Sequence, residues 1–356
     1  MTTIPIDTLM PEITNYSDYT NQDLSLAVIG FGKMGILHSG ILNLLNPNCI
    51  RAVVDKSRFL TFGASRLVKG VQFCRDLDKI LKREDLDAAY VTTSTQSHYS
   101  IVSRLLEGHV KHIFVEKPPT ADSNQLASLI DKTHSNQTVM VGLQKRFALP
   151  FRHAKDLISK NMIGDVEEVS AHIRSGDIML PTSRFDSLGR GALLDLGIHL
   201  VDLLQWMFNV TVVEHSNCRK IHSGVDDYFE AELKTKDNLR VKIEVSWSEP
   251  QYRLPETLIR VRASEGELNV TEDYLKLKSR GKKSPFNDQE ELAIDKPHYY
   301  STTPPVNLAD PEYVLEDLHF LYSRHYHKEP LTSLRSVTET MELIDEAYRQ
   351  VNVRDG

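Results

Sequence analysis

A short apolar segment followed by closely spaced glycines constrains the fold of this chain more than any other feature. The run Leu26–Ile29 leads into Gly30-Phe31-Gly32-Lys33-Met34-Gly35, which has the spacing GxGxxG. A helical pattern covers Lys33–Leu45, and Asp55 ends the next apolar run 20 residues after the last glycine. Glycine turns are common, but a strand before, a helix after and an acid at this distance are typical of a dinucleotide-binding turn.

Each glycine has its own physical reason in such a turn. Gly30 permits the tight bend, Gly32 lets the backbone approach a pyrophosphate, and Gly35 lets the helix pack closely on the strand. The N-terminus of the helix is then directed at the phosphate charge. The residues that we predict to bind the cofactor through this turn are Gly30, Gly32, Lys33, Met34 and Gly35.

The acid after the second strand bears on the choice between NAD and NADP. Asp55 is expected to accept hydrogen bonds from the adenosine ribose hydroxyls, and its carboxylate would repel a 2′-phosphate. Arg58 leaves NADP open as the alternative, because a guanidinium can stack on adenine or reach that phosphate. We predict NAD as the cofactor, with Asp55 and Arg58 in its site.

Apolar runs and helical patterns alternate through the first half of the chain. Buried strands that alternate with helices of this length indicate a parallel, doubly wound sheet, which is the Rossmann type of α/β fold. We therefore predict a dinucleotide-binding domain over residues 24–148. The predicted strands are 24–30, 50–55, 88–92, 112–116 and 138–143, and the predicted helices are 33–45, 57–69, 76–83, 97–108 and 122–134.

The pattern changes after about Leu149. Residues 169–173 alternate between apolar and polar side chains, as a strand with one polar face does. Residues 229–233 repeat this alternation, and it resumes after Asp237-Asn238, which predicts an antiparallel hairpin. Residues 149–356 are therefore predicted to form an α+β domain with a mostly antiparallel open sheet.

Three further segments complete the outline. Residues 1–23 are polar, contain Pro5 and Pro11, and are predicted to form an N-terminal arm. Asp310-Pro311-Glu312 has the capping acid, the proline and the first-turn acid of a helix start. The segment 276–310 is interpreted as a loop, either a lid or plain surface.

Composition excludes several classes of protein. At 356 residues two domains are expected, and the net charge of −7 leaves no positive field that would attract nucleic acid. Cys49, Cys74 and Cys218 are scattered without a CxxC pair, which supports neither a disulfide framework nor a metal site. No stretch approaches the ~20 apolar residues that cross a membrane, and residues 1–23 lack the Lys or Arg of a signal peptide. We expect a cytoplasmic protein.

Charged and titratable residues also lie inside an apolar helical stretch of the second half. Residues 191–208 contain Asp195, His199 and Asp202 at offsets of four and three, which places them along one face of a helix. Unpaired buried charges are costly, so this stripe is either paired internally or lines a cavity. A structural Asp–His pair inside a packed helix is the alternative to a catalytic one.

A lysine stands where the fourth predicted strand ends. Glu116-Lys117-Pro118 closes that strand, and open α/β sheets bind ligands at the carboxyl ends of their strands. Oxidation of an alcohol needs a base, a positive donor for the developing alkoxide and groups that orient the carbon. Histidine suits the proton transfer, so His199 is the predicted base, Lys117 the donor and Asp195 the residue that orients His199 or a neighbouring hydroxyl.

Other candidates follow strand ends at the same edge. His98 begins a helix and can touch the nicotinamide side, although a surface histidine explains it as well. The full predicted cofactor set outside the glycine turn is Asp55, Arg58, Ser94, Thr95, His98, Glu116, Lys117 and Gln144.

Arginines in the second half are the weaker candidates for the substrate. Arg146 follows a strand end, and Arg174, Arg184 and Arg190 precede or enter the Asp195 helix. For each of them a solvated or salt-bridged surface position is the alternative. The predicted substrate-binding residues are Lys117, Arg146, Arg174, Asp195 and His199.

Taken together, these motifs resemble the glucose–fructose oxidoreductase/inositol dehydrogenase family (Gfo/Idh/MocA). The matching pieces are the stretches 27–35, 116–118 and 191–202, in this order along most of the chain. The resemblance implies a Rossmann domain and a second domain whose open sheet often makes oligomer contacts, here a homodimer or homotetramer. It also implies NAD(P)-dependent chemistry on sugars, cyclitols and nucleotide sugars, with Lys117, Asp195 and His199 as the catalytic residues.

The chain departs from the family pattern at three places. Thr93-Ser94-Thr95 stands where Thr-Pro-Asn is usual, which puts the nicotinamide-side contacts in doubt. Gly189-Arg190-Gly191 replaces a triple glycine, and its arginine faces either a substrate phosphate or carboxylate, or solvent. The N-terminal arm is longer than in minimal members and either embraces a neighbouring subunit or is a disordered tail.

The sequence therefore predicts an oxidoreductase that transfers hydride between NAD(P) and a secondary hydroxyl or carbonyl of a polyol, sugar or nucleotide sugar. Two other classes stay open. One is a nicotinamide-binding sensor or co-regulator without catalysis, which has no need of Lys117, Asp195 and His199 together. The other is a reductase of a non-sugar imine or carbonyl. Neither a nucleic acid nor a membrane is an expected partner.

Overall fold

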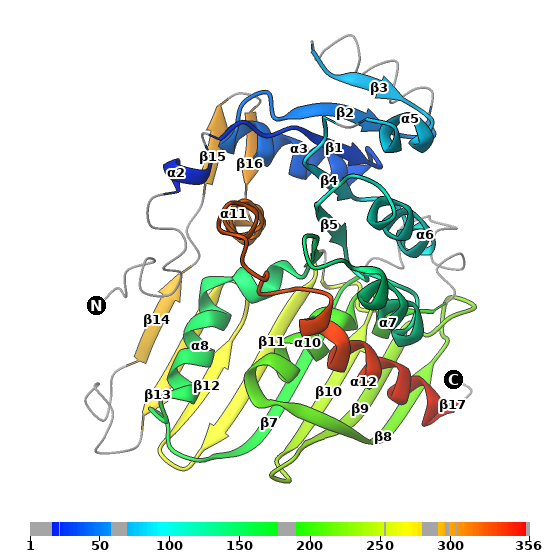
Figure 1. Ribbon diagram of the computed structural model, residues 1–356. Helices are drawn as coiled ribbons and strands as arrows, with labels where there is room; N and C mark the ends of the chain where they lie inside the picture. Colours follow the sequence, from blue (N-terminus) through cyan, green and yellow to red (C-terminus); the bar gives the residue numbers. More distant parts are fainter. Residues whose placement is uncertain are drawn as a thin grey trace. The chain divides into compact units, whose positions relative to one another are not determined.

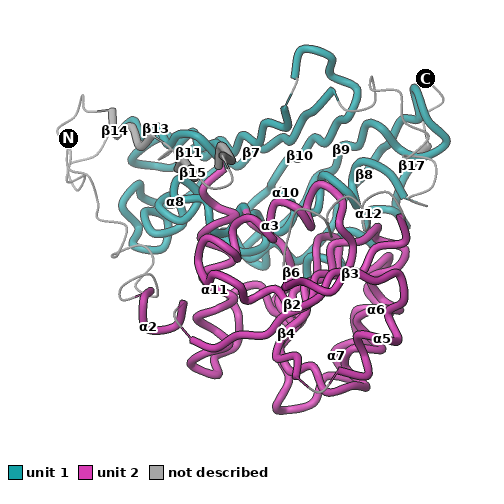
Figure 2. The backbone as a smooth tube through the Cα atoms, turned by 90° about the horizontal axis from the view of Figure 1, so that it is seen from above, with its two compact units in different colours: residues 1–5, 145–297, 339–356 teal, residues 6–144, 298–338 magenta. Residues whose placement is uncertain are grey.

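A computed structural model of the chain describes residues 16–20, 22–57, 70–83, 85–176, 190–252, 254–279, 291–295, 299–302, 305–308 and 310–353 (Figure 1). The chain divides into two compact units, which Figure 2 colours separately. Unit 1 comprises residues 1–5, 145–297 and 339–356, and unit 2 comprises residues 6–144 and 298–338.

Unit 2 contains a six-stranded parallel sheet in the order β3-β2-β1-β4-β5-β6. The predicted doubly wound sheet is confirmed, and its order reverses between β1 and β4. Every residue of β1, β4 and β5 is buried, as expected for continuous apolar runs. The strands are β1 Leu26–Ile29, β2 Ile50–Val54, β3 Gln72–Cys74, β4 Ala88–Val91, β5 His112–Glu116 and β6 Thr138–Gly142.

The helices of unit 2 follow the predicted pattern closely. The helix α3 has the bounds that the sequence predicted, and α7 begins after Asp122, whose carboxylate accepts a hydrogen bond from the N–H of Gln125. The predicted helix at 57–69 lies outside the described residues from 58 onwards. The helices are α2 Ser17–Thr20, α3 Lys33–Leu45, α5 Leu77–Leu81, α6 Thr95–Leu106, α7 Ser123–Lys132 and α11 Pro311–Tyr326. Short elements are the hairpin strands β15 Tyr299–Thr302 and β16 Pro305–Leu308, and the 3-10 turns Gln144–Phe147 and Arg335–Val337.

The helix α11 belongs to unit 2, whereas the predicted domain boundary placed it with residues 149–356. It packs against α3, and Phe320 meets the rings of Tyr90 and Phe114 at centroid distances of 5.0 and 6.1 Å. These three side chains are at most 1% exposed. The apolar face of a helix does not show which element it packs against. The sequence therefore grouped α11 with the residues next to it in the chain.

The last residues of the predicted arm fold onto the same chain. Tyr19 of α2 is 2% exposed and contacts Tyr322 and Tyr326 of α11, with ring centroids 5.7 and 6.3 Å apart. Residues 1–15 lie outside the described residues, so the choice between an embracing arm and a tail stays a prediction for them.

Unit 1 contains a nine-stranded sheet in the order β14-β13-β12-β11-β7-β10-β9-β8-β17. It is mostly antiparallel, as predicted, although β10 pairs with β7 and β17 with β8 in parallel. The hairpin predicted at Asp237-Asn238 joins β9 and β10, and Asn238 has a φ of 65°. The strands are β7 Val166–Arg174, β8 Val210–Arg219, β9 Tyr228–Thr235, β10 Arg240–Ser246, β11 Glu256–Ala263, β12 Gly266–Val270, β13 Tyr274–Ser279, β14 Glu291–Asp295 and β17 Val351–Val353.

Helices cover one face of this sheet and leave the other face open (Figures 1 and 2). Phe229, Ala231 and Leu233 of β9 are buried, and the residues between them are partly exposed. The alternation predicted from the sequence therefore separates a covered face from an open one. The helices are α8 Leu149–Ser159, α9 Ala192–Asp195, α10 Gly197–Phe208 and α12 Thr338–Arg349.

The described residues contain no helix that is both long and apolar enough to cross a membrane. Cys49, Cys74 and Cys218 are buried free thiols, so none of them forms a disulfide in the structure.

One buried histidine makes the stability of unit 2 sensitive to acid. Burial, helped by the charges of Arg324 and His327, lowers the pKa of His112 to about 4. The unfolded chain protonates this side chain near pH 6.5. The free energy of unfolding therefore falls as the pH drops from about 6.5 towards 4, and it loses nothing through this group above pH 6.5. At pH 5 His112 alone lowers the free energy of unfolding by about 2 kcal/mol relative to neutral pH.

We expect His112→Gln to lose less thermal stability than the parent protein between pH 7 and pH 5. His109→Gln is the matched control, because His109 is exposed three residues earlier. Differential scanning fluorimetry at both pH values measures the effect. Equal losses in H112Q and the parent protein would contradict this assignment.

Candidate active site

The glycine turn after β1 has the geometry that the sequence predicted. Gly30 has a φ of +95°, and a Cβ atom on it would lie 2.8 Å from the backbone of Thr92. A Cβ atom on Gly35 would lie 2.1 Å from the carbonyl oxygen of Gly30. Helix α3 therefore approaches the strand as closely as a residue without a side chain allows.

The start of α3 fits an anionic group. Gly32 is the N-cap residue, no side chain caps this helix end, and its first turn contains no acid. A Cβ atom on Gly32 would meet no atom within 4 Å, so the space beside the turn is open. Lys33 and Met34 occupy the first two helical positions, whose N–H groups have no acceptor within the helix. The turn therefore fits the pyrophosphate of a dinucleotide.

Asp55 lies directly after β2, beside this turn. Its Oδ2 accepts a hydrogen bond of 2.7 Å from the N–H of Phe31, and its Oδ1 accepts one of 2.7 Å from the N–H of Ser57. These two bonds orient the carboxylate, as a ribose-binding acid requires. Arg58, the other predicted residue of this subsite, lies outside the described residues.

Replacing Asp55 with serine is expected to shift the preference of the protein towards NADP. The change removes both the charge that repels a 2′-phosphate and a charge-assisted hydrogen bond to the ribose. We expect the ratio of the two dissociation constants to change by about 10- to 100-fold, measured by calorimetry with NAD and NADP.

Asp131→Ser is the control for this experiment, because it removes the same charge from an exposed position of unit 2. If D55S keeps the ratio of the parent protein, Asp55 does not select the cofactor.

The segment after β4 contains three of the predicted cofactor residues. Ser94 is the N-cap of α6 and Thr95 is its first residue. His98 is 1% exposed, and its Nδ1 and Nε2 lie 2.8 and 2.9 Å from the carbonyl oxygens of Pro118 and Thr93. The surface position that the sequence left open for His98 is wrong. Both ring nitrogens instead join the β4–α6 segment to the segment after β5.

Glu116 is the last residue of β5, and Lys117 and Pro118 follow it on the same edge of the sheet as the glycine turn. Glu116 is 7% exposed, and its Oε1 lies 3.0 Å from Nε2 of His38. The Oε2 atom of Glu116 accepts a hydrogen bond of 3.1 Å from the N–H of Lys117, which is half-buried. The Lys117–Pro118 peptide bond is cis.

Gln144 lies after β6, where the sequence predicted a cofactor contact. Its Nε2 donates a hydrogen bond of 2.9 Å to the hydroxyl of Tyr313 in α11. Helix α11 of unit 2 therefore holds one of the predicted residues in place.

In unit 1 the predicted helix over 191–208 is two helices, so the predicted continuous helix is wrong. Helix α9 ends at Asp195, Leu196 lies between the two, and α10 begins at Gly197. A Cβ atom on Gly197 would lie 3.0 Å from Val245 of β10, so this junction is packed against the sheet. His199 is 5% exposed within α10, and Asp195 and His199 do not share one regular helix face.

Asp202, the third acidic or basic residue of that stretch, is paired inside unit 1. Nε and Nη2 of Arg146 donate hydrogen bonds of 2.7 and 2.6 Å to its two carboxylate oxygens. Arg146 is 2% exposed, so the surface alternative for it is wrong. The two buried charges compensate each other, and removing either one would leave the other unpaired. The pair therefore holds α10 against the 3-10 turn that contains Arg146.

Two of the remaining predicted arginines, Arg174 and Arg190, also have partners. Nε of Arg174 donates a hydrogen bond of 2.8 Å to Glu244 on the open face of the sheet. Arg190 forms an ion pair with Asp345 and lies over the ring of Tyr348, with the guanidinium carbon 5.0 Å from its centroid. Arg184 lies outside the described residues.

Asp226 is a site residue that the sequence analysis missed. Its carboxylate accepts hydrogen bonds of 2.9 and 3.0 Å from the N–H groups of Gly191 and Leu193, and one from the hydroxyl of Tyr348. A Cβ atom on Gly191 would lie 1.9 Å from the carbonyl oxygen of Asp226. These contacts orient α9 and its last residue, Asp195. The sequence offers no local signal for them, because Asp226 precedes β9 and lies 35 residues from Gly191.

Comparison with protein families agrees with this geometry. The family model described as an oxidoreductase family with an NAD-binding Rossmann fold matches residues 24–143. The model of the GFO/IDH/MocA C-terminal domain matches residues 151–269. The chain belongs to the GFO/IDH/MocA oxidoreductase family. The predicted family, the NAD-binding Rossmann domain and the assignment as an oxidoreductase are thereby confirmed.

Two relatives of this GFO/IDH/MocA protein are named as dehydrogenases. Trans-1,2-dihydrobenzene-1,2-diol dehydrogenase of Xenopus laevis is 25% identical over 284 residues, which are 78% of this chain and 82% of the relative. Myo-inositol 2-dehydrogenase of Thermotoga maritima is 23% identical over 192 residues, 54% of this chain and 57% of the relative.

Of two solved structures with the same fold, one contains NADH and the other contains NADP. Levoglucosan dehydrogenase in complex with NADH has a TM-score of 0.80 at 17% identity, covering 92% of this chain and 97% of the other. A 3-ketoreductase from Actinomadura kijaniata in complex with TDP-benzene and NADP has a TM-score of 0.78 at 16% identity, covering 94% and 100%. At these identities the likeness shows the fold.

Proposed function

We propose that this protein catalyses the NAD-dependent oxidation of a secondary hydroxyl of a sugar, cyclitol or nucleotide sugar, or the reverse reduction. The observation that carries this proposal is the edge of the unit 2 sheet. There the glycine turn, Asp55 and the Glu116–Lys117 segment follow strands of one parallel sheet, at the carboxyl ends where such sheets bind ligands. The named dehydrogenase relatives support the same substrate class.

Three residues are proposed to share the chemistry. A bound NAD would supply the acceptor for the hydride that leaves the substrate carbon. His199 takes the hydroxyl proton, because a histidine can both accept and return a proton near neutral pH. Lys117 stabilises the negative charge that develops on the substrate oxygen. Asp195 orients His199 or a neighbouring hydroxyl, and Asp226 keeps Asp195 in place through α9.

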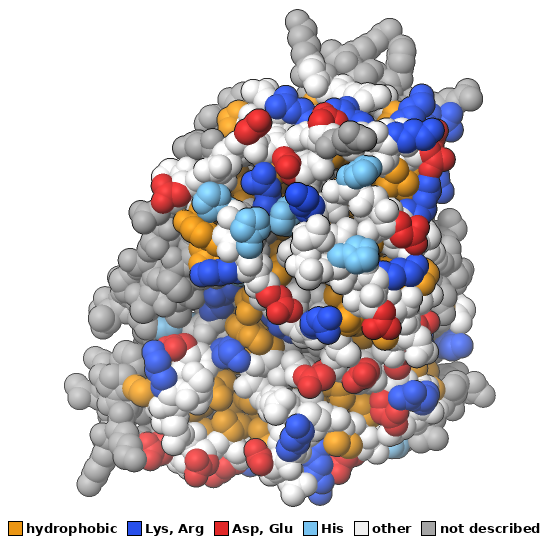
Figure 3. Space-filling view, in the orientation of Figure 1, with side chains coloured by type: hydrophobic (Ala, Val, Ile, Leu, Met, Phe, Trp, Pro, Cys, Tyr) orange, Lys and Arg blue, Asp and Glu red, His pale blue; other side chains and the backbone are white. Residues whose placement is uncertain are grey.

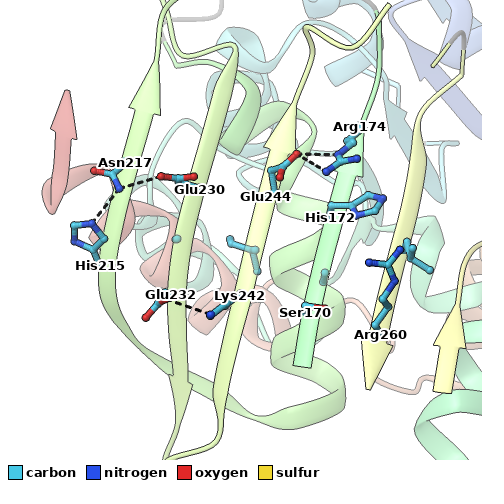
Figure 4. A pocket seen from close by; sticks show the side chains of 14 residues that line it. Ser170, His172, Arg174, His215, Asn217, Glu230, Glu232, Lys242, Glu244 and Arg260 are labelled. Carbon is cyan, nitrogen blue, oxygen red and sulfur yellow. Dashed lines mark hydrogen bonds and ion pairs between the residues drawn. The ribbon is translucent and has the colours of Figure 1, made fainter. Parts of the chain in front are cut away.

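The arginines are proposed to act differently from one another. Arg146 supports α10 through its pair with Asp202 and need not touch the substrate. Arg174 lines a pocket on the open face of the unit 1 sheet and pairs with Glu244 (Figure 4). This position supports a role for Arg174 other than contact with the reacting substrate.

Incubating the protein with NAD and a panel of polyols and UDP-sugars, while absorbance at 340 nm is followed, tests this function. Reduction of NAD by at least one cyclitol or sugar is the expected result. Tight NAD binding without turnover of any member favours the sensor, and turnover of imines or non-sugar carbonyls alone favours the other reductase. Either of these two outcomes contradicts the proposal.

We infer that the open face of the unit 1 sheet joins copies of this chain into a homodimer or homotetramer. It holds a cavity of about 430 Å³, lined by side chains that are already paired along the sheet, such as Arg174 with Glu244 and Asn217 with Glu230 (Figure 4). Sheets whose second face stays uncovered in one chain are commonly covered by another.

Reversing two exposed charges on this face, Lys242→Glu and Arg260→Glu, is expected to lower the sedimentation coefficient to that of a monomer. Each reversal adds negative charge to a face that already contains Glu230, Glu232 and Glu244, so two copies of this face should repel each other. Lys79→Glu with Lys111→Glu changes the net charge equally from exposed positions of unit 2 and is the control. An unchanged sedimentation coefficient in the open-face variant contradicts this interface.

We propose that the protein acts in the cytoplasm on small molecules and not on nucleic acid. Its three thiols are free in the structure, which fits a reducing compartment. The face in Figure 3 mixes acidic and basic side chains without a broad basic patch, and the net charge is −7. This surface is unlike the basic one that attracts a phosphate backbone.

A further inference from the structure

One peptide group of the glycine turn is held by side chains from both neighbouring strands. It is the group between Gly30 and Phe31, directly after β1. The hydroxyl of Thr92 donates a hydrogen bond of 2.6 Å to its carbonyl oxygen, and the carboxylate of Asp55 accepts one of 2.7 Å from its N–H. Thr92 follows β4 and Asp55 follows β2, the two strands that flank β1 in the sheet.

The Thr92 hydroxyl lies beside the closest approach of α3 to the turn. Thr92 is 8% exposed, and a Cβ atom on Gly35 would lie 2.9 Å from its hydroxyl oxygen. The same oxygen lies 3.4 Å from the carbonyl oxygen of Ile29, which already accepts the backbone N–H of Thr92. The shorter contact, with Gly30, therefore takes the hydroxyl proton.

This bond determines the direction of the Phe31 N–H. A peptide group is planar, so a fixed carbonyl oxygen also fixes the N–H on its other side. Gly30 has a φ of +95°, and a glycine has a wide choice of backbone angles, so Gly30 itself does not fix the group that follows it. The bond from Phe31 to Asp55 therefore depends on the bond from Thr92 to Gly30.

The Asp55 carboxylate is held at both of its oxygens. Oδ2 accepts the N–H of Phe31, and Oδ1 accepts the N–H of Ser57. With only one of these bonds the half-buried carboxylate could rotate, whereas bonds to two segments fix its plane. A carboxylate that is fixed in advance loses less freedom when it binds the ribose hydroxyls, and its charge stays where a 2′-phosphate would lie.

We propose that Thr92 determines the cofactor preference: its hydroxyl fixes the Gly30–Phe31 peptide and, through this peptide, holds the Asp55 carboxylate in the orientation that selects NAD over NADP. Thr92 acts through other groups, so it is a positioning residue. This inference rests on the cofactor preference given to Asp55. It is independent of the substrate and of the catalytic residues, because every measurement below is one of binding.

Calorimetry of the full-length protein with NAD and with NADP measures the ratio of the two dissociation constants in Thr92→Ala and Thr92→Ser. Both variants lose the threonine methyl group, and they differ from each other only in the hydroxyl. We expect T92A to shift the ratio about three- to tenfold towards NADP, as the loss of one hydrogen bond does, and T92S to keep the ratio of the parent protein. The ratio cancels any loss that both cofactors share, such as a weaker hold on the pyrophosphate.

The double variant T92A with Asp55→Ser tests whether the two residues act together. If Thr92 acts through Asp55, its hydroxyl has no further effect once the carboxylate is gone, so the ratio should equal that of D55S alone. A further shift in the double variant, as large as the one in T92A, would show that the two effects are independent and would contradict the proposal.

A purely structural role for Thr92 predicts that T92A weakens NAD and NADP by the same factor, and this result overturns the proposal. Thr332→Ala is the matched control, because Thr332 is 0% exposed and its hydroxyl donates a bond of 2.7 Å to a carbonyl oxygen of β6, at the far edge of the sheet. T332A should lose thermal stability and keep the ratio of the parent protein; a shift like that of T92A would count against Thr92. Thr92→Val also lacks the hydroxyl and gives the same test where T92A folds poorly.

The role of Asp55 and the role of Thr92 fail in different ways. If D55S shifts the ratio and T92A does not, Asp55 selects the cofactor without Thr92, and the role of Thr92 alone is overturned. If neither variant shifts the ratio, both roles are overturned. The proposed function fails separately, in the substrate panel, which these binding ratios do not involve.

Discussion

Replacing Lys117 or His199 with alanine is expected to lower turnover by about 10²- to 10⁴-fold while the affinity for NAD stays within a few-fold. Lys117 would no longer stabilise charge on the substrate oxygen, and His199 would no longer carry the proton. Both groups act on the transition state more than on the bound cofactor, so the loss should appear in kcat.

The measurement combines steady-state kinetics on the best substrate of the panel with calorimetry of NAD. Lys111→Ala is a matched control, because Lys111 is exposed and immediately precedes the same strand, β5. Turnover near that of the parent protein in either K117A or H199A would remove that residue from the mechanism. A parallel loss of NAD affinity would indicate damage to the cofactor turn instead.

Gly35→Ala is expected to destabilise unit 2 and to abolish tight NAD binding. The added Cβ atom would lie 2.1 Å from the carbonyl oxygen of Gly30, a backbone atom that cannot move aside cheaply. Helix α3 must then shift away from the turn that binds the pyrophosphate. Overpacking of this kind costs about 1–3 kcal/mol or more, and the displaced helix end no longer meets the phosphates.

Gly40→Ala in the same helix is the control with the opposite sign. A Cβ atom there would meet nothing within 4 Å, and alanine is a better helix former than glycine by about 1 kcal/mol. Thermal unfolding and NADH fluorescence titration compare the two variants. Tight NADH binding by G35A would show that the close approach of α3 is not required.

Local patterns in the sequence were enough for the cofactor half of the fold. The strand, the glycine turn, helix α3 and Asp55 lie within one stretch of 30 residues, and the structure confirms them with only small shifts at their ends. Their geometry depends on neighbours in the chain. Glycine tolerates the bend, the apolar run is buried on both faces, and the helix follows at once.

The same patterns failed where the deciding contact is distant. The stretch 191–208 has the apolar content of one helix, but it divides into α9 and α10 at Leu196, beside the packing of Gly197 against Val245 of β10. Asp226 accepts hydrogen bonds from the N–H groups at the start of α9. Neither contact leaves a periodic signal in the sequence, because each joins residues of different elements.

The sequence by itself determined the Rossmann sheet, the alternating strands of the second sheet, the family and the class of cofactor, since each depends on hydrophobic period or on residues a few positions apart. Only the tertiary structure decided which groups are paired. His38 meets Asp317 across 279 residues and Glu116 across 78, and helix α11 joins unit 2. Charge pairing depends on distance in space, and burial makes it strong, so it follows from the fold and not from the order of the residues.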